Sequence, residues 1–180
     1  MQKTNYKNFI KEKVEEIREE VGKEKAINAL SGGVDSSAVT VLGNKALGTQ
    51  LTTFFVEDGL MRENEAQQVY DDFKNLEIEI KVIDAKDRFF KALEDLEDPE
   101  HKRNAITNTF YNDVFRSIIK ETGAKYLFHG TILTDIEETK AGIKRQHNIF
   151  EQIGINPEER FGYKIIEPLK TLRKDDVRGL

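Results

Sequence analysis

The sequence predicts an α/β fold in which helices cover a parallel β-sheet. Three observations predict it: short apolar segments rich in β-branched and aromatic residues, segments whose apolar residues recur at helical spacing, and the alternation of the two along the chain. The alternation repeats at roughly 25-residue intervals, and crossovers of that length join parallel strands. Parallel sheets bind ligands at the carboxyl ends of their strands, so a site is expected in the turns that follow them.

Each expected element has its own pattern. Apolar residues separated by Lys and Glu recur at helical spacing over residues 10–21, which is typical of an amphipathic helix that Gly22 ends. Apolar runs or alternating patterns predict strands over residues 25–30, 51–56, 78–82, 125–130 and 163–169. Helical spacing predicts the intervening helices within residues 38–46, 60–73, 89–96 and 100–122.

Proline, glycine and a loss of periodicity mark the expected boundaries in the second half. Pro99 is expected to end the helix before it, and Gly123 is expected to cap the helix over residues 100–122. Over residues 134–161 the periodicity fails, and Gly, Asn, Pro and charged residues dominate. This pattern indicates a mobile loop that closes over a ligand as a lid.

The composition fits one domain and excludes several classes of function. The chain has 180 residues, of which 38% are hydrophobic. Its 28 Lys and Arg against 33 Asp and Glu give a net charge of -5, so binding to nucleic acid or to an anionic membrane is not expected. The absence of cysteine excludes disulfides, cysteine-ligated metals and a thiol nucleophile on this chain. No apolar run approaches the ~20 residues of a membrane span, and the first residues do not resemble a secretory signal, so a cytoplasmic location is expected.

The most informative motif is SGGVDSS, at residues 31–37 between an expected strand and an expected helix. Gly32 and Gly33 permit a tight turn and a close approach of the backbone to a ligand, because they have no Cβ. Two serine hydroxyls and the first amides of the helix supply donors at one place, and Asp35 can hold a metal there. The pattern therefore predicts a phosphate-binding loop, although GxxxxGK[ST] and GxGxxG motifs are absent. The alternative is a turn that only caps the helix, with Asp35 or Ser36 as N-cap.

This loop resembles the PP-loop of the N-type ATP pyrophosphatases, and its surroundings resemble the ATP-pyrophosphatase domain of GMP synthetases. The likeness is collinear over nearly the whole chain. Its further segments are VEDGLMRENEA at 56–66, DRFFKAL at 87–93, DPEHKR at 98–103, GTILTDIEET at 130–139, IKRQHN at 143–148 and EPLKTLRKDDVR at 167–178.

The resemblance implies a fold and a reaction. The implied fold for residues 1–180 is the adenine nucleotide alpha hydrolase-like (Rossmann-like) fold of three layers, with residues 134–161 as its lid. The implied enzyme is an ATP-dependent C–N ligase, in which a carbonyl oxygen of xanthosine monophosphate attacks the α-phosphate and ammonia displaces the adenylate, with AMP and pyrophosphate as products. ATP and Mg²⁺ are the implied cofactors. The implied partners are the purine nucleotide substrate, a glutamine amidotransferase subunit that supplies ammonia, and a second copy in a homodimer.

The resemblance also assigns roles to single residues. Asp35, Asp135 and Lys144 are implied to be catalytic, the two aspartates as ligands of Mg²⁺, and Arg103 and Glu138 are implied to bind the purine nucleotide. The residues implied to bind ATP are Ser31, Gly32, Gly33, Val34, Asp35, Ser36, Ser37, Val56, Gly130 and Thr131. Of the three histidines, His129 is expected to line the site, because it follows a strand and precedes Gly130.

Departures from the family pattern leave two alternatives open. The substrate-side motif GTxYPDxIES has lost its proline, and Thr139 replaces its serine. The lid motif has lost one histidine and its paired glycines over residues 145–154. The C-terminal dimerisation domain of the family is not expected, since residue 180 falls near its start. A PP-loop ATPase that adenylates a different acceptor is therefore one alternative, and an ATP-binding module without catalysis is the other.

Overall fold

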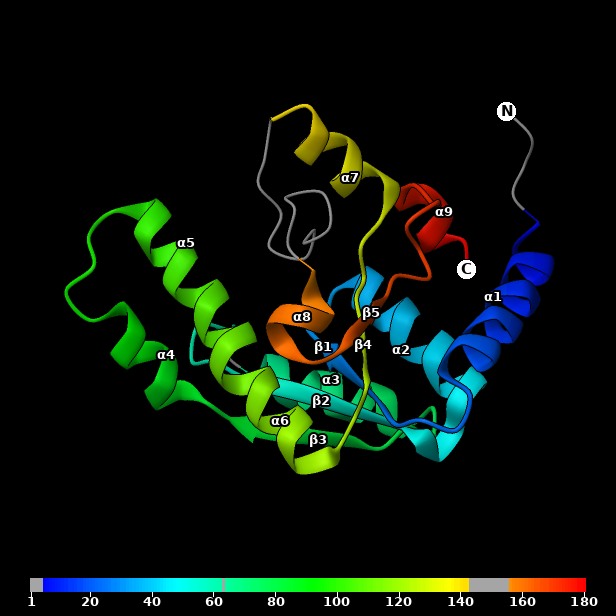
Figure 1. Ribbon diagram of the computed structural model, residues 1–180, viewed down its shortest axis with the longest axis horizontal. Helices are drawn as coiled ribbons and strands as arrows, with labels where there is room; N and C mark the ends of the chain where they lie inside the picture. The colour runs from blue at the N-terminus through cyan, green and yellow to red at the C-terminus, as the bar shows by residue number, and fades with distance from the viewer. Residues whose placement is uncertain (1–4, 63, 143–155) are drawn as a thin grey trace.

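The computed structural model describes residues 5–62, 64–142 and 156–180 and has a five-stranded parallel sheet at its centre (Figure 1). The strands lie in the order β3-β2-β1-β4-β5, and every neighbouring pair is parallel. Their bounds are Ala26–Leu30 for β1, Leu51–Glu57 for β2, Ile80–Asp84 for β3, Tyr126–Phe128 for β4 and Lys164–Ile166 for β5. The parallel sheet predicted from the sequence is confirmed.

Helices connect the strands. The α-helices are α1 (Tyr6–Val21), α2 (Val34–Leu47), α3 (Glu65–Lys74), α4 (Lys86–Leu93), α5 (Pro99–Asn108), α6 (Arg116–Thr122), α7 (Leu133–Lys140), α8 (Pro157–Phe161) and α9 (Lys174–Arg178). A 3₁₀ turn, Gly48–Gln50, follows α2, and a π-helical turn, Thr109–Phe115, joins α5 to α6.

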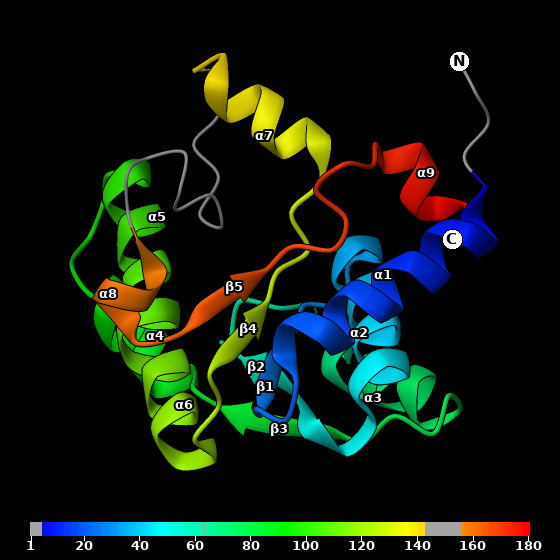
Figure 2. The same ribbon diagram turned by 45° about the vertical axis from the view of Figure 1, so that its right-hand side comes forward.

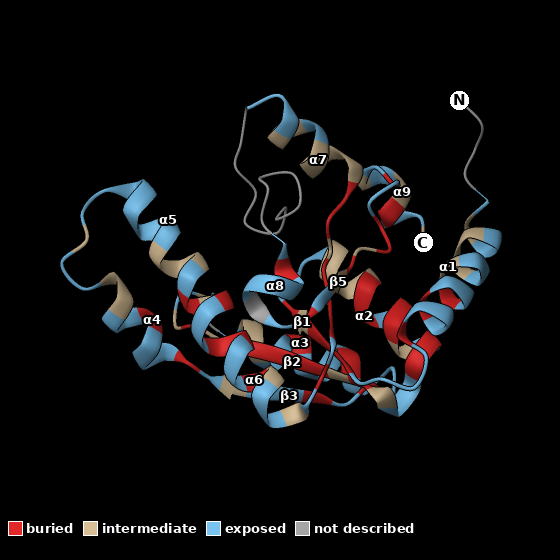
Figure 3. Cartoon of the chain, in the orientation of Figure 1, coloured by how far each residue is buried: buried red, intermediate tan, exposed pale blue. Residues whose placement is uncertain are grey.

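The helices cover both faces of the sheet, which gives the three layers that the resemblance implies (Figure 2). Apolar residues of α1, α2, α3 and α9 pack on one face. Apolar residues of α4, the π-helical turn and α6 pack on the other. In Figure 3, β1 and β2 are coloured mainly as buried, and β4 is buried as well, because these strands lie between the two helical layers. The edge strand β3 is mostly exposed.

The N-terminal helix α1 illustrates how the sequence encodes these layers. The side chain of Asn5 caps it by accepting a hydrogen bond from the amide of Asn8, and Val14, Ile17 and Val21 form its buried stripe. Lys and Glu occupy its exposed face. Within the described part of the chain, no helix is long and apolar enough to cross a membrane.

Two boundaries differ from the sequence-based expectation. Pro99 does not end the preceding helix: α4 ends at Leu93, and Pro99 is the first residue of α5. The side chain of Asp98 accepts hydrogen bonds of 2.9 Å from the amides of Glu100 and His101, and proline is favoured at the first helical position because its missing N–H is not needed there. The second difference is in residues 134–161, which were expected to form a loop, although most of α7 and all of α8 are helical there. Whether that segment acts as a lid stays a prediction.

The strand order locates the site. From β1 the chain passes through α2 to β2 on one side, whereas from β4, on the other side of β1, it passes through α7 to the outer strand β5. The connections that leave β1 and β4 therefore diverge, and a crevice forms between the carboxyl ends of these two strands.

A core substitution tests this packing. Leu127 of β4 is 0% exposed and packs among side chains from both helical and strand elements, so Leu127→Ala should lower the free energy of unfolding by about 2–5 kcal/mol. The matched control is Val41→Ala on α2, where the side chain is 41% exposed and the loss should stay below about 1 kcal/mol. Urea unfolding followed by circular dichroism measures both, and equal losses would contradict the described core.

Candidate functional site

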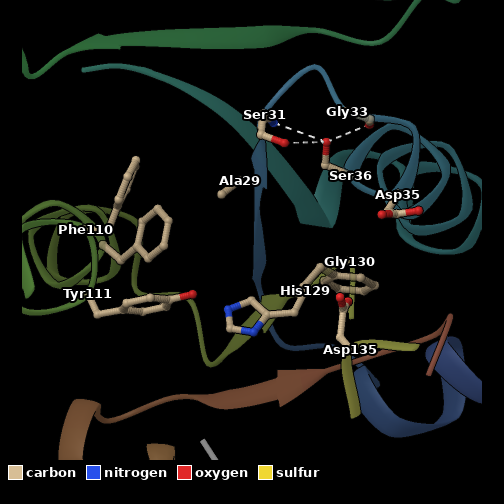
Figure 4. Close-up of a pocket in the computed structure, with 12 residues that line it drawn as sticks. Ala29, Ser31, Gly33, Asp35, Ser36, Phe110, Tyr111, His129, Gly130 and Asp135 are labelled. Atoms are coloured by element: carbon tan, nitrogen blue, oxygen red, sulfur yellow. Dashed lines mark hydrogen bonds between the residues drawn. The ribbon is translucent and has the colours of Figure 1, made fainter. Parts of the chain in front are cut away.

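A pocket of about 310 Å³ opens at the carboxyl ends of β1 and β4, where the strand order predicts a crevice (Figure 4). One wall is the loop 31–37, which contributes Ser31, Gly33, Asp35 and Ser36. The opposite wall comes from the segment after β4 and from α7. Aromatic side chains of the π-helical turn close one end.

The backbone of the loop 31–37 is open towards the pocket. Gly32 has a φ of 76°, and a Cβ there would lie 2.8 Å from Cγ2 of Val69 on α3, so both the backbone conformation and the space require glycine. Gly33 is the N-cap of α2, and in the described structure no side chain caps this helix end. The alternative interpretation, in which Asp35 or Ser36 is the N-cap, is therefore wrong. The first-turn amides of α2 have no intrahelical acceptor, and together with the positive end of the helix dipole they can bind an anion.

Ser36 fixes the shape of this loop. Its hydroxyl donates to the carbonyl of Gly33 at 2.9 Å, accepts from the amide of Ser31 at 3.2 Å and lies 2.9 Å from the Ser31 hydroxyl. One turn further along, the buried Thr40 hydroxyl donates to the Ser36 carbonyl at 2.7 Å and accepts from the side-chain amide of Asn28 on β1. These bonds tie the loop and α2 to the central strand.

Asp35 lies in the first turn of α2 with its two carboxylate oxygens in different surroundings. Oδ2 accepts a hydrogen bond of 2.7 Å from Nζ of Lys174. Oδ1 is buried and has no hydrogen-bond partner among the described residues. A buried acceptor without a partner costs roughly 1–3 kcal/mol, so this oxygen is suited to bind a cation.

The segment after β4 approaches the start of α2 closely. A Cβ on Gly130 would lie 3.2 Å from the carbonyl carbon of Asp35 and from the amide nitrogen of Ser36. Two residues beyond Gly130, the amide of Ile132 donates to Oδ2 of Asp135 at 3.1 Å, which holds this carboxylate in the first turn of α7. The close approach therefore brings Asp135 and Asp35 to the same pocket.

The donors present fit Mg²⁺. Asp35 and Asp135 both line the pocket, and Oδ1 of Asp35 is available. The described residues contain no group of three or more metal-ligating side chains. Mg²⁺ does not require such a group, because it is usually held by one or two carboxylates together with phosphate oxygens and water.

Phe110, Tyr111 and Phe115 of the π-helical turn form the aromatic end of the pocket. The Tyr111 hydroxyl points towards the ring of His129, and the ring centroids are 5.8 Å apart (Figure 4). Burial, with smaller contributions from Tyr163 and Glu167, raises the pKa of Tyr111 far above its ordinary value. Tyr111 is therefore a neutral hydroxyl at physiological pH, beside a buried histidine.

The structure brings some of the sequence-predicted residues together and leaves others apart. Ser31, Gly33, Asp35, Ser36, Gly130 and Asp135 line the pocket, as does His129. Gly32, Val34 and Ser37 belong to the same loop without lining the pocket, and Thr131 is fully buried behind it. The side chain of Val56 packs in the core against the second helical layer, so only its backbone is available to a ligand.

The residues expected to bind the purine nucleotide are not among those that line this pocket. Arg103 is on α5, where it forms an ion pair of 2.6 Å with Glu100 and lines a separate pocket of about 380 Å³. Glu138 is half-buried on α7. Lys144 lies outside the described residues. Assignment of these three to substrate or catalysis stays a prediction.

Sequence reasoning missed two features of the pocket. The aromatic end of the pocket, with Phe110 and Phe115, was not predicted, since a π-helical turn leaves no recognisable spacing in one sequence. Lys174 belongs to the segment EPLKTLRKDDVR, but no role followed from it. No helix was predicted at this lysine, and nothing in the sequence indicated that it reaches Asp35.

Comparison with known proteins identifies the family. The family model described as NAD synthase matches residues 3–126, which is more than half of the chain. The chain belongs to the NAD synthase family of PP-loop proteins. An NH3-dependent NAD synthetase from Campylobacter jejuni has the same fold, with a TM-score of 0.71 over 98% of this chain and 72% of that chain at 13% identity.

Relatives of higher identity to this PP-loop chain are GMP synthases. One subunit of the glutamine-hydrolyzing GMP synthase of Pyrococcus abyssi is 46% identical over 177 residues, which cover 98% of this chain and 56% of that protein. The glutamine-hydrolyzing GMP synthase of Thermosipho melanesiensis is 47% identical over 186 residues, which cover 97% of this chain and 35% of that protein. The resemblance to GMP synthetases is thereby confirmed. The chain spans about half the length of the one relative and about a third of the other.

Substitution of Gly130 tests the close approach in the PP-loop pocket. In Gly130→Ala, the added methyl would push the segment after β4 away from the first turn of α2, because its nearest neighbours are backbone atoms at 3.2 Å. Affinity for inorganic pyrophosphate, measured by calorimetry with Mg²⁺, should fall roughly tenfold, or about 1.4 kcal/mol. The control is Gly22→Ala after α1, which strains a φ of 58° and should lower stability without changing pyrophosphate affinity. Unchanged affinity in Gly130→Ala would contradict a site at this contact.

The raised pKa of Tyr111 predicts a loss of stability in alkali. The folded protein keeps this proton, whereas the unfolded chain releases it at a pH of about 10. The contribution of Tyr111 to the free energy of unfolding is therefore constant below that pH and decreases as the pH rises above it. Between about pH 9 and about pH 11 the loss from this group should be about 1.4 kcal/mol. Tyr111→Phe keeps the ring without the titrating hydroxyl. Over the same pH range, the free energy of unfolding of this variant, measured in urea, should therefore fall by about 1.4 kcal/mol less than that of the unsubstituted protein. If the free energies of unfolding of the two proteins fell equally with pH, Tyr111 would not have the raised pKa.

Proposed function

We propose that residues 1–180 form the ATP-pyrophosphatase domain of a GMP synthase, which adenylates xanthosine monophosphate with ATP so that ammonia can replace the adenylate. The observation that carries the proposal is the open loop 31–37, where uncapped amides of α2 and two serine hydroxyls converge on a pocket that also contains Asp35. The relatives that are 46% and 47% identical, both named GMP synthase, support the choice of acceptor.

The loop determines which bond of ATP breaks. If its amides and hydroxyls bind the β- and γ-phosphates as a unit, the developing negative charge is stabilised on pyrophosphate, and pyrophosphate becomes the leaving group. An oxygen of the acceptor then forms a bond to the α-phosphorus while the bond from that phosphorus to the bridging oxygen breaks. Ammonia attacks the adenylated carbon, and AMP leaves with the former carbonyl oxygen.

The two carboxylates are suited to hold Mg²⁺ against the phosphates. Asp35 offers its unpartnered Oδ1, and Asp135 is fixed by its hydrogen bond to Ile132. Mg²⁺ bound there would neutralise charge on the pyrophosphate leaving group. Val56 is proposed to contact the nucleoside through its backbone, and Gly130 and Thr131 to contact the phosphates from the opposite wall.

The partners follow from the same proposal. The Pyrococcus abyssi relative is named as one subunit of a glutamine-hydrolyzing GMP synthase, so that enzyme contains at least one further polypeptide. We therefore propose a glutamine amidotransferase subunit as the source of ammonia for this chain, in the cytoplasm. Arg103 and Glu138 as purine-nucleotide residues, Lys144 in a lid over residues 134–161, and a homodimer belong to the same proposal.

Product analysis tests the reaction. The complete protein, incubated with ATP, Mg²⁺, xanthosine monophosphate and ammonium, should form GMP, AMP and pyrophosphate in equal amounts, as measured by chromatography. Asp35→Asn should lower turnover at least roughly a hundredfold and ATP affinity much less, because the metal charge acts mainly on the leaving group.

Asp113→Asn is the matched control, since Asp113 forms an exposed ion pair with Arg88 on another helix and should leave turnover unchanged. Formation of ADP, or AMP formation that does not depend on xanthosine monophosphate, would reject the proposed reaction.

A further inference from the structure

The helix that carries Asp135 contacts the segment around α9 at two points. No residue of α7 is buried, and α7 stands apart from the helices that cover the sheet, with its first turn beside the segment that leads into α9 (Figures 1 and 2). The amide of Leu133 donates a hydrogen bond of 2.9 Å to the carbonyl of Leu172. One turn further along α7, the carboxylate of Glu137 forms an ion pair of 2.8 Å with the guanidinium of Arg173.

The α9 side of these contacts is anchored. Leu172 and Val177, on either side of Arg173, are 5% and 3% exposed and belong to the core that includes α2. Arg173 is the N-cap of α9, and its amide donates to Oδ2 of Asp176 at 3.3 Å. The guanidinium therefore extends from a fixed backbone, whereas its partner Glu137 belongs to a helix without buried residues. The ion pair is thus placed to hold α7 against α9.

Glu137 and Asp135 lie on opposite faces of α7. Two residues turn an α-helix by about 200°, so the ion pair acts on the side of the helix away from Asp135. Asp135 lines the pocket together with Asp35, and its Oδ2 accepts a hydrogen bond from the amide of Ile132. A rotation or shift of α7 would therefore move Asp135 relative to Asp35, and the contact between Glu137 and Arg173 opposes that movement.

The sequence of α7 differs from the family motif in two ways that concern this contact. The motif GTxYPDxIES has isoleucine where this chain has Glu137, so the motif itself supplies no ion pair here. The proline of the motif, which would fix φ in the first turn of the helix, is Thr134 in this chain. The helix has therefore lost one conformational restraint and gained a charged contact.

The exposure of the ion pair limits its contribution to stability. The side chains of Arg173 and Glu137 are 51% and 49% exposed, and ion pairs with this degree of exposure contribute little to folding. A small contribution is still sufficient to choose between positions of a helix that has no buried residues, because such positions differ little in free energy. The pair is therefore expected to affect the position of α7 more than the stability of the fold.

We propose that Glu137 and Arg173 are positioning residues, whose ion pair holds α7 so that Asp135 and Asp35 bind one metal ion together. This inference rests on the proposed function, because it takes the two aspartates as ligands of Mg²⁺. Neither Glu137 nor Arg173 has to touch the nucleotide. Loss of the pair raises the concentration of Mg²⁺ that the site requires, whereas saturating Mg²⁺ restores the site, because the bound ion itself then holds Asp135.

Single substitutions separate positioning from a simple effect of charge. The measured quantity is the Mg²⁺ concentration that gives half-maximal binding of inorganic pyrophosphate to the complete protein, followed by calorimetry. It should rise roughly two- to fivefold in both Glu137→Gln and Arg173→Met, which is the effect of losing one exposed ion pair. A purely electrostatic influence would shift the two variants in opposite directions, because Arg173→Met removes a positive charge and thereby favours a cation.

The matched control is Glu158→Gln. It breaks another exposed ion pair, between Glu158 and Lys164 at the amino-terminal end of β5, and should leave the Mg²⁺ requirement unchanged. At saturating Mg²⁺, all three variants should bind pyrophosphate within about twofold of the unsubstituted protein. Thermal unfolding of each variant checks that it is folded.

Exchange of the two charges tests the pair itself. In Glu137→Arg, two cations would face each other, and the required Mg²⁺ concentration should rise about tenfold because like charges repel. Adding Arg173→Glu restores an ion pair of reversed direction at the same net charge as the unsubstituted protein. The double variant should therefore return to within about twofold of the original Mg²⁺ requirement.

The outcomes separate this inference from the function beneath it. If the unsubstituted protein does not bind pyrophosphate at any Mg²⁺ concentration, the proposed function fails. If it binds, any result other than a rise in both single variants rejects the positioning role and leaves the proposed function standing. A loss that persists at saturating Mg²⁺, or a double variant that is not restored, would also reject it, because the residues would then act through other contacts.

Discussion

The candidate site depends on the contact between the segment after β4 and the first turn of α2. Gly130 lies so close to the backbone of Asp35 and Ser36 that a side chain there would meet it at 3.2 Å. This approach places the uncapped amides of α2 opposite the start of α7, and it brings two carboxylates from distant parts of the sequence to one pocket. The parallel sheet permits this approach, because β1 and β4 are parallel neighbours and the segments that follow them begin side by side at the same edge.

Buried polar bonds maintain this contact from below. Asn28 and Thr40 are 2% and 0% exposed, and they link β1 to α2 and then to the Ser36 carbonyl. A shift of α2 would break these buried hydrogen bonds and leave polar atoms without a partner. Other positions of the helix are therefore disfavoured. The loop is thus pre-formed, and a ligand does not have to order it, which lowers the entropic cost of binding.

Much of the fold and part of the site could be predicted from the sequence. The strands and the PP-loop were predictable because their signals are local: apolar runs set β1 and β2, and Gly32 marks a backbone conformation that only glycine adopts easily. Val56 shows the limit, since a strand buried on both faces has apolar residues throughout, and the sequence does not tell which side chains face a ligand. The π-helical turn and the bond from Lys174 to Asp35 were not predictable, because the first has no spacing signature and the second joins residues 139 positions apart.

Charge balance explains why an anion site of this kind contains acids. A pocket that bound phosphate with lysines alone would hold ATP and its products with similar strength, because the same charges attract both. Backbone amides supply only weaker, fixed partial charges. Carboxylates repel phosphate unless they hold a cation, so strong binding of a phosphate chain depends on that cation. If Asp35 holds the proposed Mg²⁺, the net charge of this wall depends on the partner of Asp35, which in this structure is Lys174 at 2.7 Å. The affinity of the loop for a phosphate chain would then depend on that partner and not on the loop alone.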